Sequence, residues 1–374
     1  MIPSLRRPTY VEVDLGAIRA NVIKLGSFAR GSVHIGAVVK ADAYGHGARE
    51  VAHAAYEAGA EMFFVATLDE ALSLRTSLPE PPIVMLGEPD SRYLDEVFEA
   101  NITPTIHQMT TLKAMIALTH SRHGSWRPAL HLEVETGLHR LGSDTSSVLE
   151  LAALARAHGL EVAGVYSHLA RADEGEPGRA SVFVQVARLT KAYERTCEVL
   201  GYRPLLHMAN TAGLLRYPET AFDLVRLGIG MYGYEGPSTL GLRPALRLVS
   251  RVARLHELDG DSGVSYGHRR SLPSGTTIAT IPIGYADGVR RNLFDAGGQV
   301  LIRGRRHDLA GVVAMDHVMV VVDDQTVAVG DEVVLIGGQG DDFLGADEIA
   351  SRLCTISYEI LTGISDRVPR RYRG

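Results

Sequence analysis

The sequence predicts an α/β TIM barrel, a (β/α)8 barrel, followed by a mostly β domain. Short apolar runs alternate with amphipathic helical stretches up to about residue 235, which is typical of a parallel sheet with crossover helices. Beyond GPSTLGLRPA, strand-like runs separated by Gly, Asp and Pro predominate. The chain has 374 residues, more than a single core usually supports, so two domains are expected.

Eight apolar runs of strand length occur in the first part of the chain, one for each rung of the barrel. Between them, several stretches have apolar residues at spacings of three and four, and some end in Gly, which is typical of helices. The strands are expected at 33–39, 62–67, 82–87, 102–106, 129–134, 161–168, 205–210 and 223–227, and the clearest helices at 50–60, 91–100, 146–159 and 181–201.

The C-terminal part of the chain has the sequence pattern of a mostly β domain. Its strands are expected at 246–255, 277–284, 299–303, 311–322 and 331–337, with turn residues between them. Only GADEIASRL, 345–353, has the pattern of a helix there.

Composition excludes several classes of function. The formal net charge is -6, with no broad basic surface for a nucleic-acid backbone. The two cysteines, Cys197 and Cys354, cannot form a disulfide framework or a zinc site by themselves, and we expect no metal. The N-terminus lacks the apolar segment of a secretion signal, and no run approaches the roughly 20 apolar residues that span a bilayer. A cytoplasmic protein acting on a small molecule is therefore expected.

Chemically informative side chains follow the predicted barrel strands. TIM barrels carry their active sites at the carboxyl ends of these strands. Lys40 is the most informative, because an amine at the carboxyl end of a barrel strand can bind a carbonyl compound covalently as an imine. The residues at such positions are Lys40, Glu133 with Arg140, His168, Asn210 and Arg226.

The segment VVKADAYGHG around Lys40 resembles the signature of fold-type III pyridoxal-phosphate (PLP) enzymes, the alanine racemases in particular. Further similarity runs from VEVDLGAIRAN to ISYEILTGISDRVPRRY, so it covers nearly the whole chain. The resemblance implies a PLP-dependent racemase that interconverts L-alanine and D-alanine for peptidoglycan, as a homodimer with shared active sites. The change of pattern places the start of the β domain at about residue 241, and the resemblance adds residues 1–11 to it, so we expect a barrel domain at 12–240 and a β domain formed by 241–374 with 1–11.

The resemblance implies a two-base mechanism. Lys40 would carry the cofactor and act as one base, and Tyr266 of the partner subunit would act as the other. An unperturbed lysine amine has a pKa of about 10.4 and a tyrosine phenol a pKa of about 10, so both bases need perturbing neighbours. His168 and Arg226 fit that need for the phenol.

The resemblance also assigns the cofactor and substrate contacts. Arg226 would face the pyridine nitrogen and donate a hydrogen bond without protonating it. The phosphate would be held by Tyr44, Thr211, the backbone of Gly228 and Ile229, and Tyr358, with Asn210 beside them. For Asn210 and Thr211, helix capping remains an open and compatible alternative. Arg140 and the backbone N–H of Met315 would bind the substrate carboxylate, and Asp316 would orient the Met315 loop.

Two positions depart from the family pattern. Many members have a carbamylated lysine where this chain has Glu133, so we expect Glu133 to hold Arg140 without modification; a carboxylate pointing to solvent is the alternative. Val312 stands where an arginine usually joins an entry corridor with the positions of Asp173 and Arg291. Tyr285 and Tyr358 would form the inner ring of that corridor. Losing a corridor cation should weaken steering of anionic substrates.

Other readings of the sequence stay open. A racemase of broader or serine-type specificity is the nearest alternative, since Glu133 and Val312 depart from the pattern. A non-catalytic PLP-binding protein is more remote, because such proteins end after the barrel whereas this chain continues through Tyr266 and Met315.

Overall fold

The structure, a computed structural model, describes residues 7–29, 31–121, 129–235, 240–323 and 326–374. Its contacts divide the chain into two compact units. The barrel unit comprises 18–43 and 48–242, and the β unit comprises 1–17, 44–47 and 243–374, in each case as far as these residues are described. The expected limits of the barrel domain are residues 12 and 240, whereas the contacts place them at residues 18 and 242. Residues 1–6 and 236–239 lie outside the described residues.

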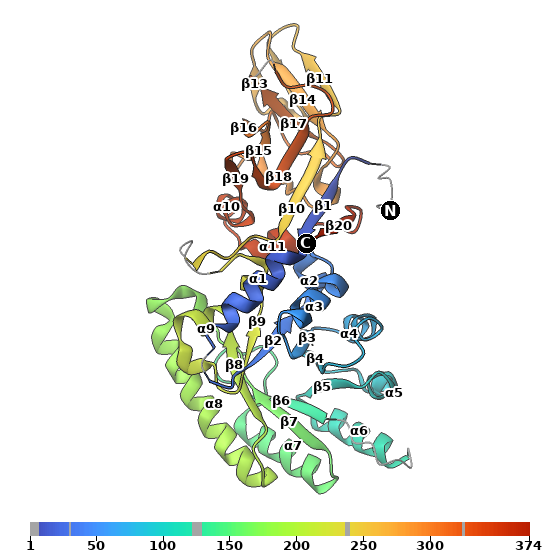
Figure 1. The fold of residues 1–374 in the computed structure, drawn as a ribbon, viewed down its shortest axis with the longest axis vertical. Helices are drawn as coiled ribbons and strands as arrows, with labels where there is room; N and C mark the ends of the chain where they lie inside the picture. The colour runs from blue at the N-terminus through green and yellow to red at the C-terminus, as the bar shows by residue number, and fades with distance from the viewer. Residues whose placement is uncertain (1–6, 30, 122–128, 236–239, 324–325) are drawn as a thin grey trace. The chain divides into compact units, whose positions relative to one another are not determined.

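The barrel unit is built on a closed ring of eight parallel strands (Figure 1). The ring closes where the first strand pairs with the last, with His34 opposite Leu224. All eight predicted strands are present, and most are shorter by one to three residues. They are β2 (His34–Val38), β3 (Met62–Val65), β4 (Ile83–Met85), β5 (Ile102–Ile106), β6 (Ala129–Glu133), β7 (Glu161–Tyr166), β8 (Leu205–Asn210) and β9 (Leu224–Leu227).

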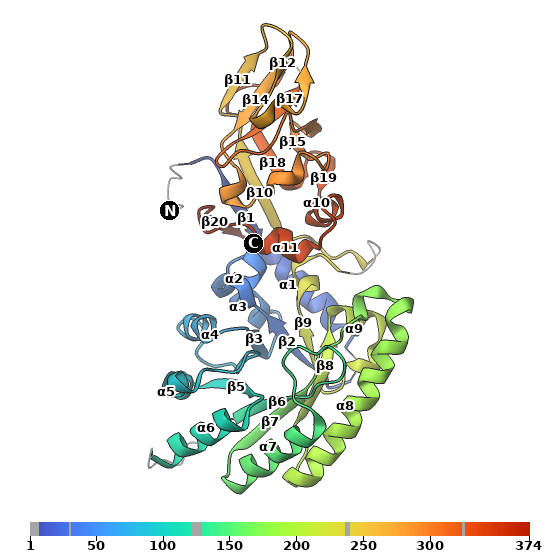
Figure 2. The ribbon, with the colours of Figure 1, turned by 180° about the vertical axis from the view of Figure 1, so that it is seen from behind.

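Helices follow the strands and lie around the outside of the ring, as the views from both sides show (Figures 1 and 2). Their apolar faces pack on the strands; Val182, Leu189 and Ala192 of α8, for example, are fully buried. Burying each such aliphatic side chain contributes about 1.5–3 kcal/mol. The helices are α1 (Leu15–Gly26), α3 (Ala48–Glu57), α4 (Leu68–Arg75), α5 (Leu94–Glu99), α6 (Met109–Ser121), α7 (Thr145–Ala157), α8 (Arg179–Leu200) and α9 (Thr211–Arg216), with 3-10 turns η1 (Ser91–Tyr93), η2 (Ala172–Glu174), η3 (Glu176–Gly178), η4 (Pro218–Thr220) and η5 (Ile229–Tyr232).

The interior of the ring contains aromatic and imidazole side chains contributed by different strands. Tyr166 and His207 stack with ring centroids 4.8 Å apart, and His131 lies 5.1 Å from His207. Gly164 makes room for His131, because a Cβ at this position would lie 2.7 Å from the imidazole. A polar, tightly packed cluster therefore lies inside the barrel.

The β unit contains a seven-stranded sheet in the order β16-β15-β18-β10-β1-β20, with β19 paired to β18. A three-stranded sheet, β11-β14-β17, and a short pair, β12-β13, complete it. The strands are β1 (Tyr10–Asp14), β10 (Leu246–Arg251), β11 (Arg254–Glu257), β12 (Ser262–Gly263), β13 (Ser271–Leu272), β14 (Thr277–Ile281), β15 (Gln299–Ile302), β16 (Arg305–Asp308), β17 (Val318–Val322), β18 (Glu332–Gln339), β19 (Asp342–Leu344) and β20 (Arg370–Arg373).

The start of the chain joins this sheet. β1 pairs antiparallel with β10 and parallel with β20, so that Val11 faces both Leu248 and Arg370. The strand continues to Asp14, three residues beyond the expected limit at 11.

Three expectations for the β unit are wrong. The run 246–255 is not one strand but two, β10 and β11, which belong to different sheets. The predicted helix is present as α10 (Ala346–Arg352), but a second helix, α11 (Ser357–Thr362), follows it; six residues are too few for a clear helical period. Of the run 311–322, only Val318–Val322 is a strand. The carbonyls of Ala314 and Met315 instead accept hydrogen bonds from the amides of Tyr285 and Ala286. None of the helices in the described part of the chain is long and apolar enough to cross a bilayer.

Candidate active site

Lys40 lies at the carboxyl end of the first barrel strand and begins a left-handed turn. The turn, α2 (Lys40–Gly45), has four consecutive residues with positive φ, namely Ala41 (51°), Asp42 (50°), Ala43 (52°) and Tyr44 (54°). A non-glycine residue pays about 1–2 kcal/mol for this conformation. The strain is offset by anchoring contacts: Glu70 Oε1 accepts from the Ala41 amide at 2.8 Å, and Asp42 Oδ1 accepts from the Ala48 amide at 2.8 Å.

The surroundings of Lys40 favour the neutral amine. Burial lowers the pKa of Lys40, and the positive charges of Arg140 and Arg226 lower it further, while Glu70 acts in the opposite direction. A neutral amine is the form that can act as a nucleophile or as a base. The position of Lys40 thus suits covalent chemistry with a carbonyl compound.

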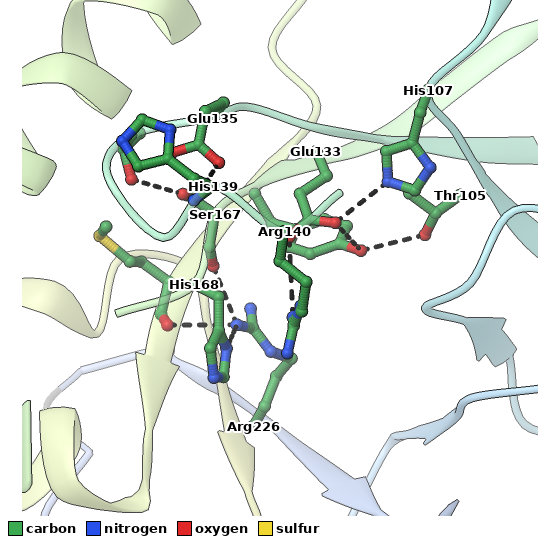
Figure 3. A network of polar contacts seen from close by, with 12 residues as sticks. Thr105, His107, Glu133, Glu135, His139, Arg140, Ser167, His168 and Arg226 are labelled. Carbon is green, nitrogen blue, oxygen red and sulfur yellow. Dashed lines mark hydrogen bonds and ion pairs between the residues drawn. The ribbon is translucent and has the colours of Figure 1, made fainter. Parts of the chain in front are cut away.

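Arg226, on β9, is 3% exposed and is held by neutral groups (Figure 3). Its Nη1 lies 2.6 Å from His207 Nδ1, and its Nη2 lies 3.3 Å from His168 Nδ1. Nη2 also donates to the carbonyls of Ser167 at 3.0 Å and Met208 at 3.2 Å. These contacts fix the plane of the guanidinium, which keeps its proton at neutral pH.

The two histidines beside Arg226 are neutral at physiological pH. Burial, reinforced by the charge of Arg226, lowers the pKa of His168 to about 3. The same two causes place the pKa of His207 well below its usual value. Each imidazole can therefore accept a hydrogen bond from the guanidinium through Nδ1.

Glu133, the last residue of β6, is 4% exposed, which rules out a carboxylate pointing to solvent. Its Oε2 lies 3.0 Å from His107 Nε2 (Figure 3). The same oxygen accepts from the Tyr166 hydroxyl at 3.3 Å. Its Oε1 lies 4.0 Å from Arg140 Nη2, longer than a hydrogen bond. Glu133 is thus within ion-pair distance of Arg140 but makes no hydrogen bond to it, and its shortest contacts are with His107 and Tyr166.

Arg140 lies on the loop that follows β6 and has a half-exposed side chain. The base of this loop is closed by the amide of Glu135, which donates to the Ser143 carbonyl at 2.8 Å, and by the Ser143 amide, which donates to the Glu133 carbonyl at 2.9 Å. The Glu135 carboxylate accepts from two amides inside the loop, those of Gly137 and His139. The loop is therefore shaped by its own hydrogen bonds, and the guanidinium remains accessible.

The residues expected at the phosphate in the barrel unit are also close together. Asn210 Oδ1 accepts from the Gly213 amide at 2.9 Å and caps α9, as the alternative reading allowed. Thr211 Oγ1 accepts from the Gly228 amide at 3.0 Å, so that amide already has a partner. The Thr211 hydroxyl keeps its own proton for an anion, and Ile229 begins η5 beside it.

The β unit brings together a second set of the predicted residues. Tyr44 and Tyr358 have ring centroids 5.6 Å apart, and burial raises the pKa of the Tyr44 hydroxyl. Asp316, next to Met315, accepts from Arg367 Nη2 at 2.7 Å. Met315 is 52% exposed and Tyr285 is 39% exposed, so both are available for contacts outside their own unit.

Tyr266 is 67% exposed and begins the turn η7 (Tyr266–His268). It lines a shallow groove of about 660 Å³ together with Ala314, His317 and Met319. The preceding Ser265 donates to the Val312 carbonyl at 2.6 Å. Val312 itself is 2% exposed and packs within the β unit.

Two predicted corridor residues lie in different units. Asp173 belongs to η2 in the barrel unit, and Arg291 begins η9 (Arg291–Leu293) in the β unit. The predicted site residues therefore form two groups. The barrel unit contains Lys40, Glu133, Arg140, His168, Asp173, Asn210, Thr211, Arg226, Gly228 and Ile229, and the β unit contains Tyr44, Tyr266, Tyr285, Arg291, Met315, Asp316 and Tyr358.

Sequence reasoning missed several members of the barrel network. The most important are His107, which directly follows β5, and Glu88, which follows β4; Tyr166 and His207 were missed as well. A signal was present, since His107 and Glu88 stand at the ends of predicted barrel strands, as Lys40 and His168 do. The pairing across strands was not visible in the order of the residues.

Models of two domain families match the chain. The first, described as alanine racemase, N-terminal domain, matches residues 13–236. The second, described as alanine racemase, C-terminal domain, matches residues 245–372. Together they span nearly all of the sequence.

Individual proteins match over the same length. An alanine racemase of Symbiobacterium thermophilum is 42% identical over 98% of both chains, and alanine racemase 1 of Bacillus subtilis is 39% identical over 98% of this chain and 93% of its own. Among solved structures, the alanine racemase of Bacillus anthracis with bound L-Ala-P has a TM-score of 0.91 at 36% identity and covers 99% of this chain and 96% of its own. The enzyme of Streptomyces coelicolor also has a TM-score of 0.91 at 36% identity, with 98% of both chains covered.

Proposed function

Because the chain belongs to the alanine racemase family, we propose that it interconverts L-alanine and D-alanine with pyridoxal phosphate as its cofactor. The observation that supports this most directly is the position of Lys40, at a barrel strand end with its pKa lowered by burial and by the charges of Arg140 and Arg226. An amine in this setting can bind an aldehyde and later take a proton.

The residues present fit the cofactor. A buried guanidinium on Arg226, held rigidly by neutral partners, suits a ring nitrogen that must accept a hydrogen bond. The hydroxyls of Thr211, Tyr44 and Tyr358, together with the backbone of Ile229 and with Asn210 beside them, would hold the phosphate. The Gly228 amide would join them on exchanging its present acceptor, Thr211 Oγ1, for a phosphate oxygen. When bound, pyridoxal phosphate supplies the electron sink that makes the α-proton of an amino acid removable.

Two protein groups would move that proton. Lys40 serves one face of the substrate, and Tyr266 of the partner subunit serves the other. The 67% exposure of Tyr266 supports a role outside its own unit. Neutral His168 and charged Arg226 would lie near the phenol and help it to ionise.

Two donors would bind the substrate carboxylate, Arg140 and the amide of Met315. Arg140 is half-exposed, and its guanidinium makes no hydrogen bond to Glu133, whose nearest oxygen is 4.0 Å away, so its donors can bind the substrate carboxylate. Asp316, tied to Arg367, would keep the Met315 loop in position. Tyr285 and Tyr358, with Asp173 and Arg291 further out, would form the entry corridor.

Assembly and context follow from the same proposal. Since Tyr266 would act on a neighbouring chain, the active form is a homodimer with shared sites in the cytoplasm, where D-alanine is used for peptidoglycan. Replacement of the usual corridor arginine by Val312 leaves a broader, serine-accepting racemase as the alternative.

Deuterium incorporation tests the proposal. The pure holoenzyme is incubated in heavy water with each L-amino acid in turn, and D-product and α-deuterium are measured. We expect both from alanine, and serine turnover would decide between the narrow and broad readings. Reduction with borohydride followed by peptide mass spectrometry should place the cofactor on Lys40. Absence of D-alanine from a cofactor-loaded protein would refute the proposal.

A further inference from the structure

Three ionisable groups, one buried and two largely buried, form a row across the carboxyl end of the barrel. Glu88 follows β4, His107 follows β5, and Glu133 ends β6, so the row crosses three successive strands. His107 Nδ1 lies 3.6 Å from Glu88 Oε2, and His107 Nε2 lies 3.0 Å from Glu133 Oε2. The three side chains are only 10%, 7% and 5% exposed, in the order Glu88, His107 and Glu133.

Both carboxylates favour a charged imidazole. Burial opposes the charge, but the hydrogen bonds and charges of Glu133 and Glu88 outweigh it and raise the pKa of His107 to about 9. Glu88 in turn accepts hydrogen bonds from the Gln108 amide at 3.1 Å and from the Thr111 hydroxyl. Burial raises the pKa of Glu88, but these two hydrogen bonds and the one from His107 outweigh burial and lower it. The row therefore carries an alternating charge at neutral pH.

The row ends at the residue assigned to the substrate carboxylate. Glu133 uses Oε2 for His107 and Tyr166 and leaves Oε1 facing Arg140 at 4.0 Å. His107 also contacts the Arg140 loop through its backbone, because Ser143 Oγ donates to the His107 carbonyl at 2.9 Å. His107 thus influences both the charge that Arg140 faces and the base of the loop that carries it.

We infer that His107, clamped between Glu88 and Glu133, is a positioning residue for carboxylate binding: it orients Glu133 and offsets part of its charge, which leaves Arg140 available to the substrate. Without the imidazolium, the full charge of Glu133 would act on Arg140 alone and draw the guanidinium away from a bound carboxylate. The inference rests on the proposed function, because it takes Arg140 as the carboxylate-binding residue.

The charge on His107 should appear as a pH dependence of ligand binding. The charged and titratable groups that face it are Glu88 from the segment after β4, Glu133 from β6 and, through Glu133, Tyr166 of β7 and Arg140. Loss of the imidazolium proton leaves two carboxylates opposite a single guanidinium. Carboxylate binding should therefore weaken as the pH rises past the point at which His107 titrates.

Propionate is a suitable probe, because it has the carboxylate and methyl group of alanine without an amino group that titrates in the same range. Its dissociation constant is measured by calorimetry on the holoenzyme from about pH 7 to about pH 10.5. The variants are His107→Gln, which can keep a hydrogen bond to Glu133 but no charge, and Glu88→Gln, which removes the distal charge. Thr111→Val is the matched control, because it removes a hydrogen bond to Glu88 and leaves the charges in place.

We expect His107→Gln to weaken propionate binding about tenfold near neutral pH and to remove the alkaline change in affinity. Glu88→Gln should move that change to lower pH by about one unit, whereas Thr111→Val should leave it in place. If His107→Gln does not fold, the comparison of Glu88→Gln with Thr111→Val still tests the inference through the pH at which propionate affinity changes.

Wild-type affinity in His107→Gln at every pH, or an unmoved alkaline change in Glu88→Gln, overturns the inference while the proposed function stands. A wild-type holoenzyme that neither racemises alanine nor binds propionate would remove the proposed function, and the inference with it.

Discussion

His207 Nδ1 lies 2.6 Å from Nη1 of Arg226, in the interior of the barrel. The hydrogen-bond partners described for Arg226 are all neutral, since His207 and His168 have lowered pKa values and the others are carbonyl oxygens. The guanidinium is therefore fixed in position without having its charge cancelled by a hydrogen-bonded carboxylate. That arrangement suits a group that must donate to a ring nitrogen without giving up its proton.

Arg226→Glu should lower the racemisation rate by about 100-fold or more, because the donor that faces the ring is replaced by an acceptor or an acid. A glutamic acid can protonate the ring and make it a stronger electron sink. Half-transamination should then increase relative to racemisation, measured as pyridoxamine phosphate formed per D-alanine. Arg226→Lys, which keeps the charge, is the control. An unchanged ratio of the two products would exclude this role.

Glu133 should make the enzyme indifferent to bicarbonate, because its carboxylate carries a charge without modification. Adding or removing bicarbonate should leave the wild-type rate unchanged, while Glu133→Ala should raise KM for alanine through the loss of order at Arg140 and His107. Glu133→Lys provides the contrasting variant, since its activity should respond to bicarbonate. Undiminished activity in Glu133→Ala would contradict the assignment.

Mixed dimers should test whether sites are shared. Lys40→Ala and Tyr266→Phe subunits are each expected to be inactive alone. If each site takes Lys40 from one subunit and Tyr266 from its partner, mixed dimers contain one intact site. Random exchange of equal amounts should then restore about a quarter of wild-type activity. Continued inactivity, with exchange confirmed by mass spectrometry, would show that both bases come from the same chain.

His107 should make stability depend on pH in a predictable direction. Its folded-state pKa is raised from 6.5 to about 9, so its contribution is fully present below about 6.5 and is lost as the pH rises through about 9. The free energy of unfolding of the wild type, relative to His107→Gln, should fall by roughly 3 kcal/mol at most over this range. Urea unfolding at equal protein concentrations measures it. A constant difference across the range would show that His107 is not charged in the folded protein.

Glycine at Ala41 should stabilise the fold, because Ala41 has a φ of 51°. Relief of left-handed strain is worth about 1–2 kcal/mol and is partly offset by the entropy of the glycine in the unfolded chain. The exposed Ala153, inside α7, is the matched control, and glycine there should cost about 1 kcal/mol. Urea unfolding of the two variants should therefore give shifts of opposite sign. A destabilised Ala41→Gly variant would show that the turn is not strained.

Much of the fold was predictable from the order of the residues. Apolar runs of strand length and helical spacings of three and four are local patterns, and the eight barrel strands were found because burial repeats at each of them. α11 was missed because six residues hardly complete the period that reveals a helix. The segment before Val318 was read as a strand because it is apolar, although its carbonyls bind the turn at Tyr285 and Ala286.

The sequence by itself determined the fold class, the resemblance around Lys40 and the residue types available for chemistry, because these depend on composition and local spacing. Only the tertiary structure decided which of those residues meet. Glu88 and His107 are 19 residues apart in the sequence and His107 and Glu133 are 26 apart, yet barrel closure places the ends of their strands next to one another. Burial then turns that proximity into pKa shifts and a fixed row of charges, a consequence of three-dimensional packing that no stretch of the chain contains alone.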